Sequence, residues 1–156
     1  MARLSPAPPP RNGAIVEIGS YKGKSTVMLA KVAAHYRLGP VIAIDPHNFN
    51  NPELLDQRTK PDASSFDEFM RNIREAGVAD QVEPYRAYST DVAQTWNSSI
   101  RFLWIDGDHT YTGAKADFDG FARHLLPFGI VALHEVTASK LAVRGSNLWL
   151  RASSLS

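Results

Sequence analysis

The sequence contains no cysteine, so the chain forms no disulfide, uses no thiolate nucleophile and binds no metal through sulfur. Any metal must be held by oxygen or imidazole donors. No apolar run approaches the roughly 20 residues that cross a bilayer, and no membrane association is expected. The N-terminus lacks the charged-then-apolar pattern of a signal peptide, which predicts a cytoplasmic location. The formal net charge is only +1, which argues against a nucleic-acid partner.

What is present describes an ordinary globular protein. The chain has 156 residues, 44% of them hydrophobic and 21% charged, which is enough for one domain with a real core. Residues 1–12 carry four prolines among small residues and are predicted to form a disordered arm. Residues 13–136 are the predicted domain. Residues 137–156 are interpreted as a C-terminal tail or as a hairpin that turns at Gly145-Ser146.

Strand-like apolar runs alternate with segments of helical periodicity along the predicted domain. This alternation predicts an α/β fold, a Rossmann-like doubly wound and mostly parallel sheet in three α/β/α layers. The polar stretch 47–64 is too long for a simple connection and is interpreted as a substrate loop. The predicted strands are Ala14–Ile18, Val41–Ile44, Gln81–Tyr85, Ile100–Ile105 and Ile130–Leu133, and the predicted helices are Lys24–Tyr36, Ser65–Ala76, Thr90–Trp96 and Tyr111–Leu126.

The stretch from Ile15 to Thr26 predicts a strand, then a glycine turn, then the start of a helix, which is the order found in nucleotide-binding sites. Gly19 allows a sharp turn, and Gly23 allows backbone to approach a ligand beside the free N–H groups of the helix. Only three residues separate Gly19 from the Gly-Lys pair, whereas a phosphate-binding P-loop needs four. A P-loop-like NTPase is therefore a disfavoured alternative, and the dinucleotide fingerprint is not met either.

The pattern that does fit is Glu-x-Gly-x-x-x-Gly followed by an acid after the next strand. Asp45 is that acid, and a carboxylate there can hold both hydroxyls of a ribose. Pro46 keeps the chain extended just beyond it. With no pyrophosphate to bind, the ligand is expected to be a nucleoside with a short charged arm, which describes S-adenosylmethionine. Glu17 either contacts this ligand or simply caps the loop.

A second cluster follows the most apolar strand, where Asp106 is joined by Asp108 and His109 in the next turn. Methyl transfer to a hydroxyl requires that the acceptor lose its proton, and a histidine with a pKa near ~6.5 can take it. Mg²⁺ held by carboxylate oxygens would lower the pKa of that hydroxyl. Asp106, Asp108 and Glu135 are the expected oxygen ligands. His134 is expected to be a packing or rim residue.

These residues resemble class I S-adenosylmethionine-dependent methyltransferases, in the group with macrocin-type O-methyltransferases and cephalosporin-hydroxylase-like proteins. The resemblance covers about residues 13–136, and it is specific because the glycine motif is combined with an Asp-Gly-Asp-His-x-Tyr motif. It implies a methionine end bound near Gly19, adenine contact at Ser89, metal ligands at Asp106 and Glu135, and a general base at His109. The matching segments are Val16–Thr26, Ala43–Pro46, Phe102–Tyr111 and Gly129–Glu135. The residues expected to contact the cofactor are Glu17, Gly19, Ser20, Tyr21, Gly23, Ser25, Asp45, Pro46, Ser89, Asp106 and His109.

The class normally follows its fifth strand with a helix and an antiparallel strand pair, but only 21 residues follow Glu135. The sheet is therefore expected to be shortened at its C-terminal side, and its open edge favours a homodimer or a partner. The favoured function is an S-adenosylmethionine-dependent O-methyltransferase acting on a hydroxylated small molecule. A nucleoside-binding module without turnover is the alternative from another class, and a hydroxylase-like role is a third.

Overall fold

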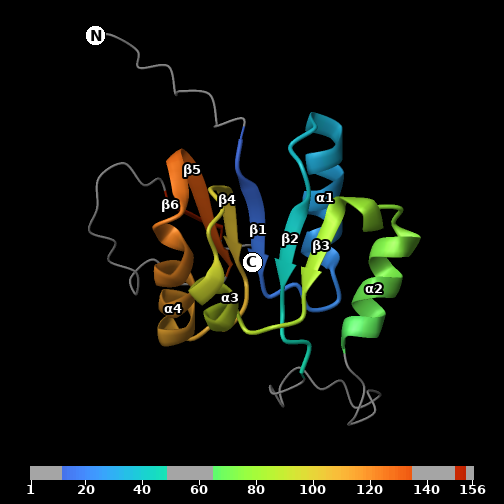
Figure 1. The fold of residues 1–156 in the computed structure, drawn as a ribbon. Helices are drawn as coiled ribbons and strands as arrows, with labels where there is room; N and C mark the ends of the chain where they lie inside the picture. Colours follow the sequence, from blue (N-terminus) through green and yellow to red (C-terminus); the bar gives the residue numbers. More distant parts are fainter. Residues whose placement is uncertain (1–11, 49–64, 135–149, 154–156) are drawn as a thin grey trace.

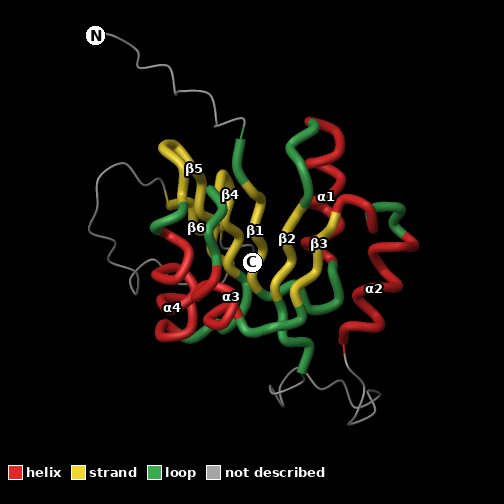
Figure 2. The backbone as a smooth tube through the Cα atoms, in the orientation of Figure 1, coloured by secondary structure: helices red, strands yellow, loops and turns green. Residues whose placement is uncertain are grey.

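The structure, a computed structural model, describes residues 12–48, 65–134 and 150–153. Within these residues the strands form one sheet in the order β3-β2-β1-β4-β5-β6, and every neighbouring pair is parallel (Figures 1 and 2). The strands are β1 Ala14–Ile18, β2 Val41–Ile44, β3 Val82–Tyr85, β4 Ile100–Ile105, β5 Leu125–His134 and β6 Leu150–Ser153. The helices are α1 Lys24–Tyr36, α2 Ser65–Glu75, α3 Ser89–Thr95 and α4 Tyr111–Ala122, with a short 3-10 helix at Ala79–Gln81.

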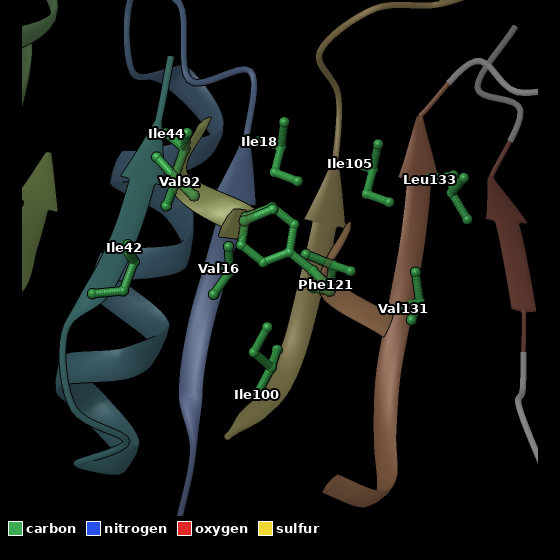
Figure 3. Close-up of a cluster of buried hydrophobic side chains, with 12 residues drawn as sticks. Val16, Ile18, Ile42, Ile44, Val92, Ile100, Ile105, Phe121, Val131 and Leu133 are labelled. Carbon is green, nitrogen blue, oxygen red and sulfur yellow. The ribbon is translucent and has the colours of Figure 1, made fainter. Parts of the chain in front are cut away.

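The predicted doubly wound parallel fold is confirmed, because two apolar layers lie on opposite faces of this sheet. Alternate residues of each strand point to opposite faces, so Ile15 and Val16 join different clusters. The face with Val16 packs against α3 and α4, with the fully buried ring of Phe121 at its centre (Figure 3). The face with Ile15 packs against α1 and α2, where Phe69 is fully buried. Each helix therefore buries one stripe against a strand pair.

The boundary between α4 and β5 differs from the prediction. The helix was expected to run to Leu126 but ends at Ala122, and β5 already begins at Leu125. The backbone N–H of Ile100 donates to the carbonyl of His124 at 2.8 Å, and Leu125 then pairs with Ile100. These bonds place Leu125 in the sheet. Ile100 pairs with Leu125 and Phe102 pairs with Ile130, so the register of the β4–β5 ladder shifts between these two pairs.

The chain order of the strands fixes where a ligand can sit. From β1 the chain moves outward to β2 and β3, then crosses to the other side of β1 to form β4 and β5 (Figure 1). The loops after β1 and β4 therefore leave in opposite directions at the carboxyl edge of the sheet. Such a switch point opens the crevice in which doubly wound folds bind ligands.

Several predicted segments fall partly or wholly outside the described residues. They are the proline-rich arm (1–12, of which only residue 12 is described), most of the 47–64 loop, Glu135, and all of the predicted 137–156 tail or hairpin except residues 150–153. In the described part of the tail, Leu150 pairs in parallel with Val131 of β5. The domain boundaries stay predictions. Among the described helices, none has the length and apolar character needed to cross a membrane.

Candidate active site at the carboxyl edge of the sheet

Backbone hydrogen bonds continue past the end of β1 and bring three strand-end loops together. The N–H of Gly19 donates to the carbonyl of Ile44 at 2.9 Å, and the N–H of Asp106 donates to the carbonyl of Ile18 at 2.8 Å. Gly19 is thus placed between the residues that follow β2 and β4. The acids predicted at these strand ends, Asp45 and Asp106, flank the glycine loop on its two sides.

The two glycines of the loop are required, each for a reason visible in the fold. Gly19 has φ of +88°, and a Cβ there would clash with the backbone of Asp106 and lie 2.6 Å from Gly107 Cα. Gly23 has φ of +85°, and a Cβ would lie 3.0 Å from the ring of Phe69. Gly23 therefore makes room for α2, which is a different reason from the ligand approach predicted from the sequence. Contact of either glycine with a cofactor stays a prediction.

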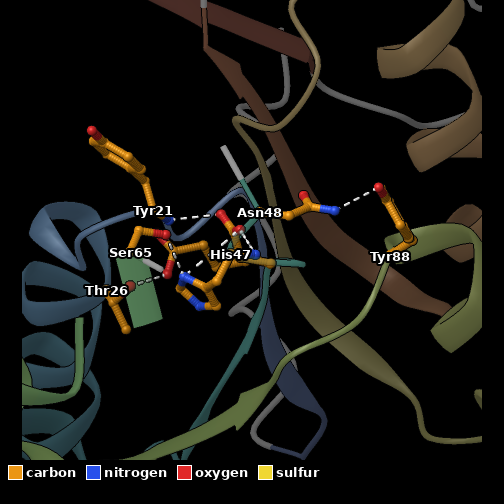
Figure 4. A network of polar contacts seen from close by, with 8 residues as sticks. Tyr21, Thr26, His47, Asn48, Ser65 and Tyr88 are labelled. Carbon is orange, nitrogen blue, oxygen red and sulfur yellow. Dashed lines mark hydrogen bonds and ion pairs between the residues drawn. The ribbon is translucent and has the colours of Figure 1, made fainter. Parts of the chain in front are cut away.

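Asp45 is fixed by two backbone donors. Its Oδ2 accepts from the N–H of Tyr21 at 2.8 Å, and its Oδ1 accepts from the N–H of His47 at 2.6 Å (Figure 4). A carboxylate oxygen has two lone pairs, so each oxygen keeps one for a ligand hydroxyl. The side chain is 15% exposed, so a ligand can reach it. Asp45 is therefore oriented by the glycine loop and by its own turn, in which Pro46 separates it from His47.

His47 stabilises the turn after β2 by packing against the start of α2. Its side chain is buried, and its Nδ1 lies 2.8 Å from the Ser65 hydroxyl at the start of α2 (Figure 4). The ring also packs on Phe66 and Phe69, with centroid distances of 5.1 and 5.2 Å. Burial lowers the pKa of His47, and the charge of Arg86 lowers it further, although Asp45 opposes this. The neutral imidazole thus connects β2 to α2.

Glu17 is enclosed and serves the first turn of α1. The side chain is fully buried, and the Thr26 hydroxyl donates to its Oε2 at 2.5 Å. Burial raises the pKa of Glu17 to about 7, and the hydroxyls of Ser25 and Thr26 offset only part of that effect. Its Oε1 has no hydrogen-bond partner among the described residues. Glu17 is thus bonded to the first turn of α1, and its contact with a cofactor stays a prediction.

The start of α1 has donors available for an anion. No side chain caps its first turn, which begins after Gly23. The neighbouring Ser20 is buried, and its hydroxyl has no hydrogen-bond partner among the described residues. Free N–H groups at a helix start together with a hydroxyl donor suit a carboxylate such as that of a methionine moiety. This part of the loop fits the charged arm expected for S-adenosylmethionine.

Ser89 begins α3 and is held by a residue that the sequence interpretation missed. Its hydroxyl donates to Oδ1 of Asp117 on α4 at 2.5 Å. Asp117 is 5% exposed, and burial raises the pKa of its carboxyl group. The pair joins α3 to α4 beneath the loop after β4, where a Cβ on Gly107 would lie 3.3 Å from Asp117 Oδ2. The only sequence signal for Asp117 was a carboxylate on an otherwise apolar helix stripe.

Asp106, His109 and His134 come together at the ends of β4 and β5. Ile105 pairs with Leu133, so the next residues of the two strands, Asp106 and His134, are neighbours. His134 Nδ1 lies 2.9 Å from Asp106 Oδ1, and the rings of His109 and His134 have centroids 6.1 Å apart. One donor atom from each of the three residues lies within 4.8 Å of the others. Asp106 and His109 thus lie close together, and their catalytic roles stay predictions.

His134, expected to be a packing or rim residue, has a side chain that is 37% exposed and also contributes a donor atom to this cluster. Asp108, the optional third oxygen ligand, instead accepts from the N–H of Thr110 at 2.8 Å in the turn before α4. Glu135 lies outside the described residues. The described donors are therefore one carboxylate and two imidazoles, which fit Mg²⁺ poorly because that ion prefers oxygen ligands.

A family profile described as Methyltransferase domain matches residues 16–136, which include every strand end discussed above. The chain belongs to this methyltransferase family. The match begins at β1 and reaches one residue beyond β5, so the glycine loop, Asp45 and the Asp106 cluster all lie inside it. The suspected methyltransferase family is thereby confirmed, and the doubly wound parallel sheet agrees with it.

Solved structures show the same fold at low sequence identity. The O-methyltransferase NovP is similar with a TM-score of 0.62 and 20% identity, over 76% of this chain and 55% of that one. The cofactor-bound Rv0187 from MTB has a TM-score of 0.57 and 22% identity, over 78% and 47%. The calicheamicin methyltransferase CalS11 has a TM-score of 0.53 and 17% identity, over 78% and 56%. The chain spans about half the length of these structures.

Proposed function

We propose that this methyltransferase domain transfers a methyl group from S-adenosylmethionine to a hydroxyl group of a small molecule. One observation carries the proposal: Asp45 is fixed by the N–H of Tyr21 at the mouth of the glycine loop. This single bond joins the loop expected to hold the methionine end to the acid expected to hold the ribose. The cofactor-bound neighbour and the O-methyltransferases of the same fold support the reaction class.

In this proposal each end of the cofactor meets donors or acceptors of the right kind. The hydroxyl of Ser20 and the first turn of α1 bind the methionine carboxylate. The two remaining lone pairs of Asp45 accept the ribose hydroxyls. Ser89 donates its proton to Asp117, so its oxygen is an acceptor for the amino group of adenine. The contacts predicted for Tyr21, Ser25 and Pro46 belong to the same loop and turn.

The acceptor hydroxyl loses its proton near Asp106, at the carboxyl edge of the sheet. S-adenosylmethionine supplies a methyl group on a sulfonium centre, and the acceptor oxygen displaces the sulfur as it loses its proton. We propose that His109 takes this proton in the metal-free protein, because it is exposed and beside the carboxylate of Asp106. A hydroxyl poised between Asp106 and the loop after β1 would lie at the switch point of the sheet.

Other expectations from the sequence stay predictions. Magnesium binding by Asp106 and Glu135 depends on a residue outside the described part of the chain. A homodimer or partner is favoured by Ile130, which is 47% exposed beside the half-buried Phe102 on the α1 face. The polar loop after β2 favours a hydroxylated acceptor. The alternative of a nucleoside-binding module without turnover shares the cofactor site and differs only in catalysis.

Calorimetric titration of S-adenosylmethionine into the wild type, Asp45→Asn and Asp80→Asn tests the proposal. Asp45→Asn is expected to weaken binding by about tenfold or more, because two charge-assisted bonds are impaired. Asp80 is an exposed acid in the 3-10 helix before β3, at the other edge of the sheet, and its variant should bind like the wild type. Equal affinity of all three proteins would contradict the proposal. Binding without methylation of any hydroxylated acceptor would favour the inactive module.

A further inference from the structure

We propose that Asp106, His109 and His134 form a binding site for one divalent transition-metal ion, and that this site prefers such an ion to Mg²⁺. The three residues follow or end adjacent parallel strands at the carboxyl edge of the sheet (Figure 1). The site deepens the proposed function because it lies where the acceptor would react. Ion binding itself can nevertheless be measured without any methyl transfer.

The spacing of the donors suits a single ion. Metal bonds to imidazole nitrogen or carboxylate oxygen are roughly 2.0–2.2 Å long, so two donors on one ion lie about 3 to 4.4 Å apart. His134 Nδ1 and Asp106 Oδ1 are 2.9 Å apart, which matches neighbouring ligand positions. All three donor atoms lie within 4.8 Å of one another, so a small rotation of a side chain completes the set.

A second observation concerns the nitrogen of His134 that faces Asp106. His134 Nδ1 is buried and lies 2.9 Å from Asp106 Oδ1, so an imidazole and a carboxylate face each other directly. A donor atom of His109 lies within 4.8 Å of both. A cation placed among them would be coordinated by all three groups, and without it the carboxylate of Asp106 is the partner of His134.

The chemistry of the donors selects the class of ion. Mg²⁺ takes oxygen ligands almost exclusively, whereas imidazole suits Zn²⁺, Fe²⁺, Co²⁺ and Ni²⁺. Two imidazoles and one carboxylate are a ligand set that leaves further coordination positions open. Those positions would be available to the acceptor hydroxyl. In the metal-bound protein His109 is a ligand, and the base role proposed above applies to the metal-free protein.

The strands also give the site a rigid base. Asp106 and His134 directly follow the last pair of the β4–β5 ladder, Ile105 with Leu133, and the Asp106 N–H donates to the carbonyl of Ile18 in β1. His109 lies in the loop before α4, whose start is capped by the Thr110 hydroxyl accepting from the N–H of Gly113 at 3.0 Å. Preorganised ligands on strand ends favour metal affinity because little ordering is needed on binding.

The experiment uses the full chain without an affinity tag, stripped of metal with a chelator. Co²⁺ and Mg²⁺ are titrated separately, by calorimetry and, for Co²⁺, by visible absorbance. We expect one Co²⁺ per chain, bound at least about 100-fold more tightly than Mg²⁺. His109→Ala and His134→Ala should each weaken Co²⁺ binding by about tenfold or more. His35→Ala is the matched control, because His35 is exposed on α1, and it should leave Co²⁺ affinity unchanged.

Two outcomes would overturn the site: Mg²⁺ affinity equal to that of Co²⁺, or Co²⁺ affinity unchanged in both histidine variants. His134→Asn serves as a second variant should the alanine form not fold, as judged by circular dichroism. S-adenosylmethionine binding is measured on the same samples. Cofactor binding without the Co²⁺ preference would refute the metal site alone. Histidine-dependent Co²⁺ binding without cofactor binding would refute the proposed function alone.

Discussion

The buried acid at the end of β1 makes the stability of this fold depend on pH. Enclosure raises the pKa of Glu17 from 4.5 to about 7 in the folded protein. The folded state therefore holds this proton at pH values where the unfolded chain has already released it. By linkage, the free energy of unfolding must fall as the pH rises from about 4.5 to about 7. Below and above that window Glu17 contributes no slope.

The size of the effect follows from the shift. Each pKa unit is worth about 1.4 kcal/mol, so the rise from 4.5 to about 7 corresponds to about 3 kcal/mol. Glu17→Gln removes the charge, keeps the volume and retains an oxygen that can accept from Thr26. We expect the variant to be about 3 kcal/mol more stable than the wild type at pH 8. At pH 4.5 and below the two proteins should be nearly equal.

Urea denaturation followed by circular dichroism, in steps from pH 4.5 to pH 8, measures this difference. Asp117, whose pKa is raised by burial, and His47, whose pKa is lowered by burial, also titrate. Both proteins share these groups, so the difference between the proteins isolates Glu17. Glu75→Gln at the exposed end of α2 is the control and should follow the wild type. Parallel curves for the wild type and Glu17→Gln would refute the raised pKa.

Two further predictions concern packing, both measured as changes in the urea midpoint. Gly19→Ala should prevent stable folding because the added Cβ clashes with the backbone after β4. Gly39→Ala is the control: Gly39 also has a positive φ but no atom lies within 4 Å of an added Cβ, so this variant should lose only about 1–2 kcal/mol of stability. Equal losses in the two variants would contradict the clash. Phe69→Ala should cost about 3–5 kcal/mol because the ring is fully buried. The half-buried Phe66 is its control, and an equal loss in Phe66→Ala would count against the packing assigned to Phe69.

Most of the fold could be predicted because its strands and helices carry regular apolar periodicity. β1, β2 and β4 have the predicted bounds, since each is a short apolar run between turn residues. The end of α4 could not be predicted, because Leu125 and Leu126 continue its helical stripe in the sequence. The bond from Ile100 to the carbonyl of His124 decides that boundary, and a single segment contains no information about such a distant partner.

The site could be predicted where a residue's position along one strand was sufficient. Asp45 and Asp106 follow apolar strands directly, and the structure places both at the carboxyl edge. His134 was missed because its nearness to Asp106 depends on the register between β4 and β5. The burial of Glu17 was missed because it depends on α1, which covers the sheet face to which Glu17 points. The position of Glu17 in β1 gives that face, but not the helix that covers it.

The parallel register described for β1, β2, β4 and β5 has a consequence for folding. The loops after β1, β2 and β4 follow parallel strands that no hairpin joins, so the candidate site assembles only when segments distant in the chain have paired. Slipping β5 by one residue would turn His134 to the opposite face and separate it from Asp106. Ligand affinity is therefore a reporter of the completed sheet. A ligand that binds only this state adds to its stability by mass action, and partly folded chains gain nothing from its presence.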